Sequence, residues 1–244
     1  MHFVRAEAVL VAVLAVTTLA VMGFVEVADD MSEADGQMFD RFVLDAVRTP
    51  GDPTNPIGPH WLEIAMADLT ALGGIAVLLA VTIVVSGFLL ILRRPLAVMF
   101  LVTALGGGIL LSQTLKRLYN RERPPLDYQA VEVINASFPS GHAMLSAVFY
   151  LTLGAIVAKA QPRKRLKAYV LTVAILLTAI VGLSRIYLGV HWATDVMAGW
   201  CVGAAWAGAC WAAAWLFERW RGRSGLSRPH HMPPEVEAPR PAVP

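Results

Sequence analysis

Residues 69–92 read LTALGGIAVLLAVTIVVSGFLLIL and residues 95–115 read PLAVMFLVTALGGGILLSQTL, and neither run contains a charged side chain. About 20 consecutive apolar residues are enough for a helix to cross a bilayer. Four further apolar runs bring the number of candidate spans to six: 8–25, 69–92, 95–115, 143–160, 168–184 and 196–217. This pattern predicts an all-α fold, a polytopic membrane helix bundle with six transmembrane helices.

The composition of the 244 residues agrees with a membrane protein. Hydrophobic residues make up 57% of the chain and charged residues only 16%, whereas an average soluble domain is about 25% charged. The mean hydropathy is +0.58. These values argue against a disordered chain and against an ordinary soluble enzyme. The formal net charge of +2 gives little support for a nucleic-acid partner.

The distribution of the charges predicts the orientation in the membrane. If both termini and the loops around 93–94 and 159–167 face the cytoplasm, that side holds 13 of the 20 basic residues and 4 of the 18 acidic ones. Basic residues favour the cytoplasmic side, so we expect both termini there. The run at 8–25 is interpreted as an uncleaved span rather than a signal peptide, because no clear small-residue cleavage site precedes the acidic residues that follow it.

Two regions lie outside the expected spans. The outer loop 26–68 carries apolar residues at helical spacing, which predicts a short amphipathic helix on the outer membrane interface. These residues are Phe39, Phe42, Val43 and Ala46. Proline and glycine between residues 49 and 59 predict turns. We expect one six-span membrane domain over 1–223, followed by a disordered, Pro-rich cytoplasmic tail over 224–244.

Three polar clusters fall at the outer ends of spans three to six. They are Lys116 with Arg123-Pro124, then Pro139-Ser140-Gly141-His142, and last Ser184-Arg185 with His191 and Asp195. Seven residues are two turns of a helix, so Lys116 and Arg123 are expected on one helix face about 10 Å apart. The i and i+4 spacing places His191 and Asp195 on one face at the start of the sixth span. A carboxylate on one imidazole nitrogen would leave the other nitrogen free as a nucleophile or base.

Each cluster also has an ordinary explanation. Lys and Arg at a span end can extend their charged groups to the interface, and this is the interpretation given to Arg117 and Arg121. Ser140 can be a helix N-cap, and a His-Asp pair can simply cap a helix. Together, however, two His, one Asp, three cations and a helix N-terminus on one membrane face match the needs of phosphoryl transfer, which are positioning and stabilisation of negative charge.

The three clusters resemble the three-part signature of the type 2 phosphatidic acid phosphatases, also called lipid phosphate phosphatases, over a motif region at 116–195. The resemblance implies that His191 attacks phosphorus and forms a phosphohistidine, while Asp195 holds its ring. It implies that His142 protonates the leaving oxygen and then activates water. The phosphoryl oxygens would be bound by the remaining residues: Lys116, Arg123, Ser140, Gly141 and Arg185. No cofactor and no metal ion are implied. Soluble vanadium haloperoxidases share this signature, but the six spans disfavour them.

The expected function is hydrolysis of a lipid phosphate or isoprenyl diphosphate, such as undecaprenyl diphosphate, phosphatidylglycerol phosphate or phosphatidic acid. The expected location is a bacterial inner membrane with the site on the extracytoplasmic face. The expected partners are the bilayer and its lipid substrate, without nucleic acid or an obligate protein partner. A lipid phosphotransferase with the same histidine chemistry remains open. A lipid transporter is disfavoured, because the apolar runs hold no acidic residue in mid-span.

Overall fold

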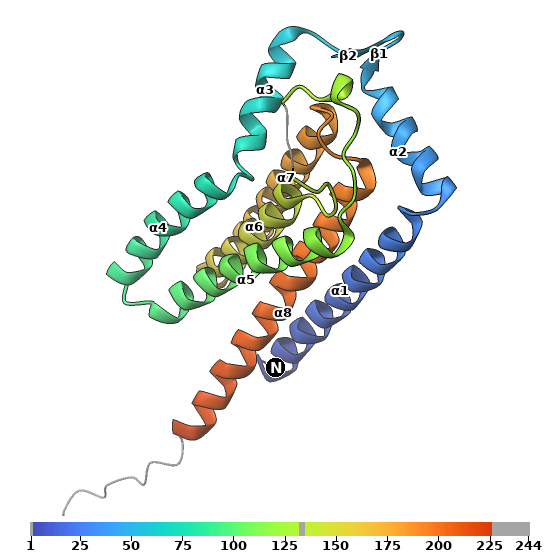
Figure 1. The fold of residues 1–244 in the computed structure, drawn as a ribbon. Helices are drawn as coiled ribbons and strands as arrows, with labels where there is room; N and C mark the ends of the chain where they lie inside the picture. The colour runs from blue at the N-terminus through green and yellow to red at the C-terminus, as the bar shows by residue number, and fades with distance from the viewer. Residues whose placement is uncertain (1, 132–134, 226–244) are drawn as a thin grey trace, which may run out of the picture.

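The computed structural model describes residues 2–131 and 135–225, which form a bundle of long helices (Figure 1). The elements in chain order are α1 (His2–Asp30), α2 (Ala34–Ala46), β1 (Arg48–Thr49), β2 (Asp52–Pro56), α3 (His60–Ala71), α4 (Ile75–Ile91), α5 (Pro95–Tyr119), η1 (Leu126–Tyr128), α6 (Gly141–Ala160), α7 (Lys164–Tyr187) and α8 (Ala193–Gly225). Among the described residues, five helices are long and apolar enough to cross a membrane, and the pair α3–α4 can make a sixth span. The predicted polytopic helical fold is therefore confirmed.

The second apolar run, 69–92, is not one straight helix as its sequence suggested. Helix α3 ends at Ala71 and α4 begins at Ile75, and the two helices are bent by 53°. The break contains Gly73, where an added Cβ would lie 2.4 Å from Cγ1 of Val181 and 3.0 Å from the carbonyl oxygen of His142. Only a residue without a side chain fits this close approach, so the glycine brings the break against both α6 and α7.

Helix α6 lies at the centre of the bundle, and α1 lies at its edge along α8 (Figure 1). In the most apolar window of each helix, 56% of the α6 residues are buried, whereas none of the α1 residues is. Helix α6 packs against α5, α7 and α8. Its contact with α8 requires a small residue, since a Cβ at Gly203 would lie 2.5 Å from the carbonyl oxygen of Met144. Small residues let membrane helices approach closely in this way.

The predicted helix in the loop 26–68 is present as α2. One face of α2 is buried and consists of Gly36, Asp40 and Leu44, at i, i+4 and i+8. The apolar side chains of Met38 and Phe42 are exposed, as an interfacial helix requires, although the position of the membrane surface stays a prediction.

The segment expected to contain only turns forms the antiparallel hairpin β1–β2, with an irregular register between Arg48 and Thr49. The buried Arg48 side chain donates to the carbonyl oxygens of Tyr187, at 2.9 Å, and Tyr128, at 2.6 Å. These hydrogen bonds hold the hairpin against the end of α7. Burial lowers the pKa of the Arg48 guanidinium below its usual value.

The last helix is longer than the apolar run that predicted it. Helix α8 continues to Gly225, so the expected start of the tail at residue 224 falls within its final turn. The rest of the expected tail, 226–244, lies outside the described residues.

Candidate active site

His191 and Asp195 are brought together, but not on one helix face as their spacing suggested. Helix α7 ends at Tyr187 and α8 begins only at Ala193, so His191 lies in the turn between them. Gly189 has a φ of +68°, a conformation that glycine adopts at no steric cost, and it reverses the chain there. Nδ1 of His191 lies 3.3 Å from Oδ2 of Asp195. The same carboxylate oxygen accepts from the backbone N–H of Trp192 at 2.9 Å, which fixes the turn to the first turn of α8.

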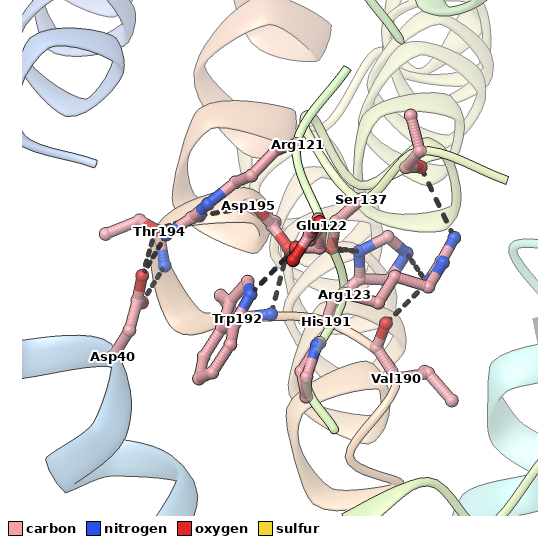
Figure 2. A network of polar contacts seen from close by, with 12 residues as sticks. Asp40, Arg121, Glu122, Arg123, Ser137, Val190, His191, Trp192, Thr194 and Asp195 are labelled. Atoms are coloured by element: carbon pink, nitrogen blue, oxygen red, sulfur yellow. Dashed lines mark hydrogen bonds and ion pairs between the residues drawn. The ribbon is translucent and has the colours of Figure 1, made fainter. Parts of the chain in front are cut away.

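The contacts of the His191 ring define its tautomer. Nε2 lies 3.3 Å from Nη1 of Arg123. A guanidinium only donates hydrogen bonds, so Nε2 must be the accepting nitrogen and the ring proton must sit on Nδ1. Nδ1–H can then donate to Asp195, and the lone pair of Nε2 points toward the cation. Figure 2 shows the ring between the Asp195 carboxylate and the Arg123 guanidinium.

The His191–Asp195 pair is withdrawn from water. The His191 side chain is 2% exposed and that of Asp195 is fully buried. Burial lowers the pKa of His191 to about 3, although its hydrogen bond to Asp195 acts in the opposite direction. The imidazole is therefore neutral at physiological pH, as a nitrogen nucleophile must be.

Lys116 and Arg123 share a site, although they do not share a helix face. Helix α5 ends at Tyr119, and Asn120 takes the left-handed conformation with a φ of 42°. Arg123 therefore lies in the following loop, which corrects the expectation of two turns of one helix. Both side chains nevertheless reach the carbonyl oxygen of Ala136, since Lys116 Nζ donates to it and Arg123 Nη2 lies 3.5 Å away.

The Arg123 guanidinium is held by the loop that precedes α6 and by the turn that precedes α8. Its Nε donates to the carbonyl oxygen of Asn135 at 2.7 Å and its Nη1 donates to the carbonyl oxygen of Val190. Burial lowers the pKa of this guanidinium, and the charge of Asp195 acts in the opposite direction. These contacts fix a cation beside the accepting nitrogen of His191.

Ser140 is the N-cap residue of α6, as the sequence indicated. Its backbone N–H donates to the carbonyl oxygen of Asp195 at 2.9 Å, which joins the second cluster to the third. Its Oγ is buried without a hydrogen bond to any described residue. At Gly141, an added Cβ would lie 3.6 Å from Cε of Lys116. The first backbone N–H groups of α6 are thus next to a lysine, an arrangement suited to an anion.

His142 and Arg185 are the last two site residues expected from the sequence. His142 is the second residue of α6, beside the α3–α4 break, where a Cβ at Gly74 would lie 3.8 Å from its Nε2. Arg185 lies in the last turn of α7 and donates from Nη1 to Oγ1 of Thr70 at 3.0 Å. Both residues therefore contact the α3–α4 segment, whereas Arg123 contacts His191.

The structure adds residues that the sequence did not single out. Ser137 donates from Oγ to Oδ2 of Asp195. Arg121, which the sequence left as an interfacial cation, donates to Oδ1 of Asp195 at 2.7 Å and to Oδ2 of Asp40 at 2.7 Å (Figure 2). Asp40 carried one usable signal, because it lies on the helical stripe of Gly36 and Leu44 that α2 buries. For Arg121, nothing in the local sequence indicated a partner.

No group of three or more His, Cys, Asp or Glu side chains within residues 2–131 and 135–225 is arranged to hold a metal ion. The site is instead rich in cationic and N–H donors, which can bind phosphoryl oxygens directly. The expectation that no metal ion takes part stays a prediction.

Comparisons with known proteins identify the family. Residues 97–219 match the PAP2 superfamily. The chain is 32% identical over 147 residues to phosphatidylglycerophosphatase B of Bacillus subtilis. The aligned region covers 59% of this chain and 70% of that protein. The chain belongs to the PAP2 superfamily, and it is a phosphatase and a multi-pass membrane protein. The predicted family and enzyme class are therefore confirmed.

Three further proteins are similar over different shares of the chain. The chain is 34% identical over 86 residues to an undecaprenyl-diphosphatase of Sulfolobus acidocaldarius. The aligned region covers 35% of this chain and 34% of that protein. The crystal structure of a transmembrane PAP2-type phosphatidylglycerolphosphate phosphatase from Bacillus subtilis is similar, with a TM-score of 0.73 and 25% identity over 88% of this chain and 98% of that one. LpxE of Aquifex aeolicus supports the fold alone, with a TM-score of 0.53 and 23% identity over 72% and 93% of the two chains.

Proposed function

We propose that this phosphatase hydrolyses a phosphate or diphosphate ester of a membrane lipid through a phosphohistidine on His191. The observation that carries the proposal is the setting of the His191 ring, with Nδ1 3.3 Å from Asp195 and Nε2 3.3 Å from Arg123. An unprotonated ring nitrogen beside a cation that can bind phosphoryl oxygens is arranged for attack on phosphorus. The phosphatase relatives support hydrolysis of a lipid phosphate.

The first step transfers the phosphoryl group to the enzyme. Nε2 of His191 forms a bond to phosphorus, and the bond between phosphorus and the lipid oxygen, or the bridging oxygen of a diphosphate, breaks. His142, in its protonated form, gives its proton to the departing oxygen. The imidazole of His191 becomes cationic in this step, and the buried carboxylate of Asp195 stabilises that charge.

The second step releases inorganic phosphate. His142, now neutral, takes a proton from water, and the water oxygen attacks phosphorus. The bond between phosphorus and Nε2 breaks, and the electron pair returns to His191. Both histidines then have their starting protonation states, so the cycle consumes only the ester and water.

Fixed positive charge stabilises the phosphoryl oxygens in both steps. Lys116, Arg123 and Arg185 supply three cations, and the Gly141 N–H and the buried Ser140 Oγ, which has no partner among residues 2–131 and 135–225, supply further donors. Donors fixed in a site with little water act more strongly than the same groups in solution. No cofactor and no metal ion is needed in this scheme.

The membrane setting decides which substrates can reach the site. We place both termini in the cytoplasm and the site at the outer end of the spans, on the basis of the charge distribution along the chain. A lipid with its phosphate at the headgroup level and its chains in the bilayer can then enter from the side. The substrate classes that fit are those of the relatives, phosphatidylglycerol phosphate and undecaprenyl diphosphate, together with phosphatidic acid.

The test is phosphate release by the purified protein in detergent, measured across a panel of these three lipids and a lipid A phosphate. His191→Ala should abolish release from every lipid that the native chain hydrolyses. His60→Ala is the matched control, because the His60 side chain is 82% exposed and its ion pair is with Glu63 at the start of α3. Activity should persist in EDTA. Full turnover by His191→Ala, or strict loss in EDTA that magnesium restores, would overturn the mechanism.

The same assay separates hydrolysis from phosphoryl transfer. With labelled lipid and added lipid or sugar alcohols, the label should appear as inorganic phosphate. Label that accumulates on an added alcohol would instead assign the chain as a phosphotransferase.

A further inference from the structure

A buried polar network joins the outer helix α2 to the catalytic carboxylate. Nη2 of Arg121 lies 2.7 Å from Oδ2 of Asp40, and its Nη1 lies 2.7 Å from Oδ1 of Asp195. Nη1 also donates to Oγ1 of Thr194 at 2.7 Å. Figure 2 shows Asp40 reaching from α2 toward Thr194 and Arg121, with Asp195 on the far side of the guanidinium.

Asp40 also caps the helix that carries Asp195. Its Oδ1 accepts from the backbone N–H of Thr194 at 2.8 Å, and its Oδ2 accepts from the Thr194 hydroxyl at 2.6 Å. Thr194 is the second residue of α8, so its N–H is one of the groups that have no partner within the helix. A carboxylate from a different part of the chain thus supplies the N-terminal cap.

The burial of this network makes its charges depend on one another. The side chains of Asp40 and Asp195 are 1% and 0% exposed, and that of Arg121 is 13% exposed. An isolated charge at such a position is costly, and the shared planar guanidinium offsets part of that cost for the two carboxylates. Removal of Asp40 would leave Nη1 of Arg121 bonded to Asp195 and Thr194 but would take away the partner of Nη2.

The orientation of Asp195 in turn sets that of the reacting ring. Oδ1 of Asp195 is occupied by Arg121, which leaves Oδ2 for His191 Nδ1, Ser137 and the N–H of Trp192. A rotation of the carboxylate would move the acceptor of Nδ1–H and with it the direction of the Nε2 lone pair. Small displacements of a reacting group reduce rate strongly.

We propose that Asp40 and Arg121 are positioning residues, which hold the Asp195 carboxylate so that His191 Nε2 faces phosphorus. Asp40 lies in α2, outside the residues that match the PAP2 superfamily, so the proposal makes α2 a functional part of the active site. This inference rests on the proposed function of His191. It assigns no contact with substrate to either residue.

The test separates positioning from simple support of the fold. Asp40→Asn keeps an oxygen that can cap Thr194 but removes the negative charge that Arg121 needs, whereas Asp40→Ala removes both. We expect Asp40→Asn to lower kcat for a hydrolysed lipid phosphate about tenfold, as loss of a residue that orients a reacting group typically does. Its KM should stay close to that of the native chain, and kcat should be compared below the unfolding midpoints of both proteins, because loss of a buried ion-pair partner also lowers stability. Asp35→Asn, an exposed position in the first turn of the same helix, is the matched control and should retain native kcat.

A double-mutant cycle with Arg121→Gln provides the second measurement. If Asp40 acts through Arg121, the double variant should have about the kcat of Arg121→Gln alone, because coupled residues are not additive. Native kcat in Asp40→Asn, or single effects that multiply in the double variant, would overturn the inference. If the proposed function is wrong instead, His191→Ala will retain turnover whatever the Asp40 variants do.

Discussion

The residues that match the PAP2 superfamily, 97–219, and the residues before them make different contributions to the site. Every residue proposed to contact phosphorus or its oxygens lies in the matched part. The preceding part supplies supports from outside: Asp40 against Arg121 and Thr194, Thr70 against Arg185, and the α3–α4 break against His142. The groups proposed to react therefore come from one part of the chain. The other part contacts the residues that hold these groups in place.

The largest expected effect belongs to the matched part. Asp195→Asn should lower kcat by about 10³-fold or more, because an amide cannot hold Nδ1–H of His191 and accept from Arg121 in the way that a carboxylate does. The measurement is steady-state phosphate release from a lipid that the native chain hydrolyses. Asp127→Asn, at an exposed position of η1, should be close to native. A kcat for Asp195→Asn within about tenfold of native would mean that the pair is structural.

A smaller effect is expected from the preceding part. Thr70→Val removes the hydroxyl that accepts from Arg185 at 3.0 Å while keeping the shape of the side chain. Loss of a hydrogen bond to a charged group should reduce kcat/KM about tenfold. Thr70→Ser keeps the hydroxyl and should retain most of the activity. Equal loss in the serine and valine variants would show that packing of α3, and not the hydrogen bond, is what matters.

The smallest effect concerns stability and compares a histidine from each part. The pKa of His191 is lowered to about 3 by burial, whereas an unfolded chain has a histidine pKa near 6.5. Between these values the unfolded state binds the extra proton, so the folded state loses stability as the pH falls below about 6.5. The loss from this group should reach about 1 kcal/mol at pH 5.5.

The check is the unfolding midpoint in detergent at pH 7.5 and at pH 5.5. His191→Asn should show a smaller decrease than the native chain, because the residue that resists protonation is gone. His60→Asn should show the native decrease, since the His60 side chain is 82% exposed. The same decrease in all three proteins would contradict the burial of His191 from solvent.

Much of the fold followed from local patterns. The lengths of the apolar runs predicted the spans, and the helical spacing of Phe39 and Phe42 predicted α2. The same logic failed where a helix ended early. Lys116 and Arg123, and likewise His191 and Asp195, have helical spacing, but the left-handed Asn120 and the positive φ of Gly189 end or turn the chain between or just before them. The choice of these four residues did not depend on the helical geometry, because the folded loops still bring their side chains together.

The partners of Asp195 could not be predicted. Arg121 lies 74 residues from Asp195 and 81 from Asp40 along the chain, and no periodicity connects positions so far apart. Arg121 and Arg117 are alike as span-end cations in the sequence. Only the packing of α2 on α8 distinguishes them.

By itself, the sequence determined that the chain is a membrane protein, how many apolar segments it has, and which side chains can handle a phosphoryl group, because hydrophobic length and residue chemistry are local properties. The tertiary structure decided which nitrogen of His191 faces a cation, that this cation is Arg123, and that Asp40 contacts Arg121 and Thr194. These depend on where remote segments meet, and that is fixed by the packing of whole helices.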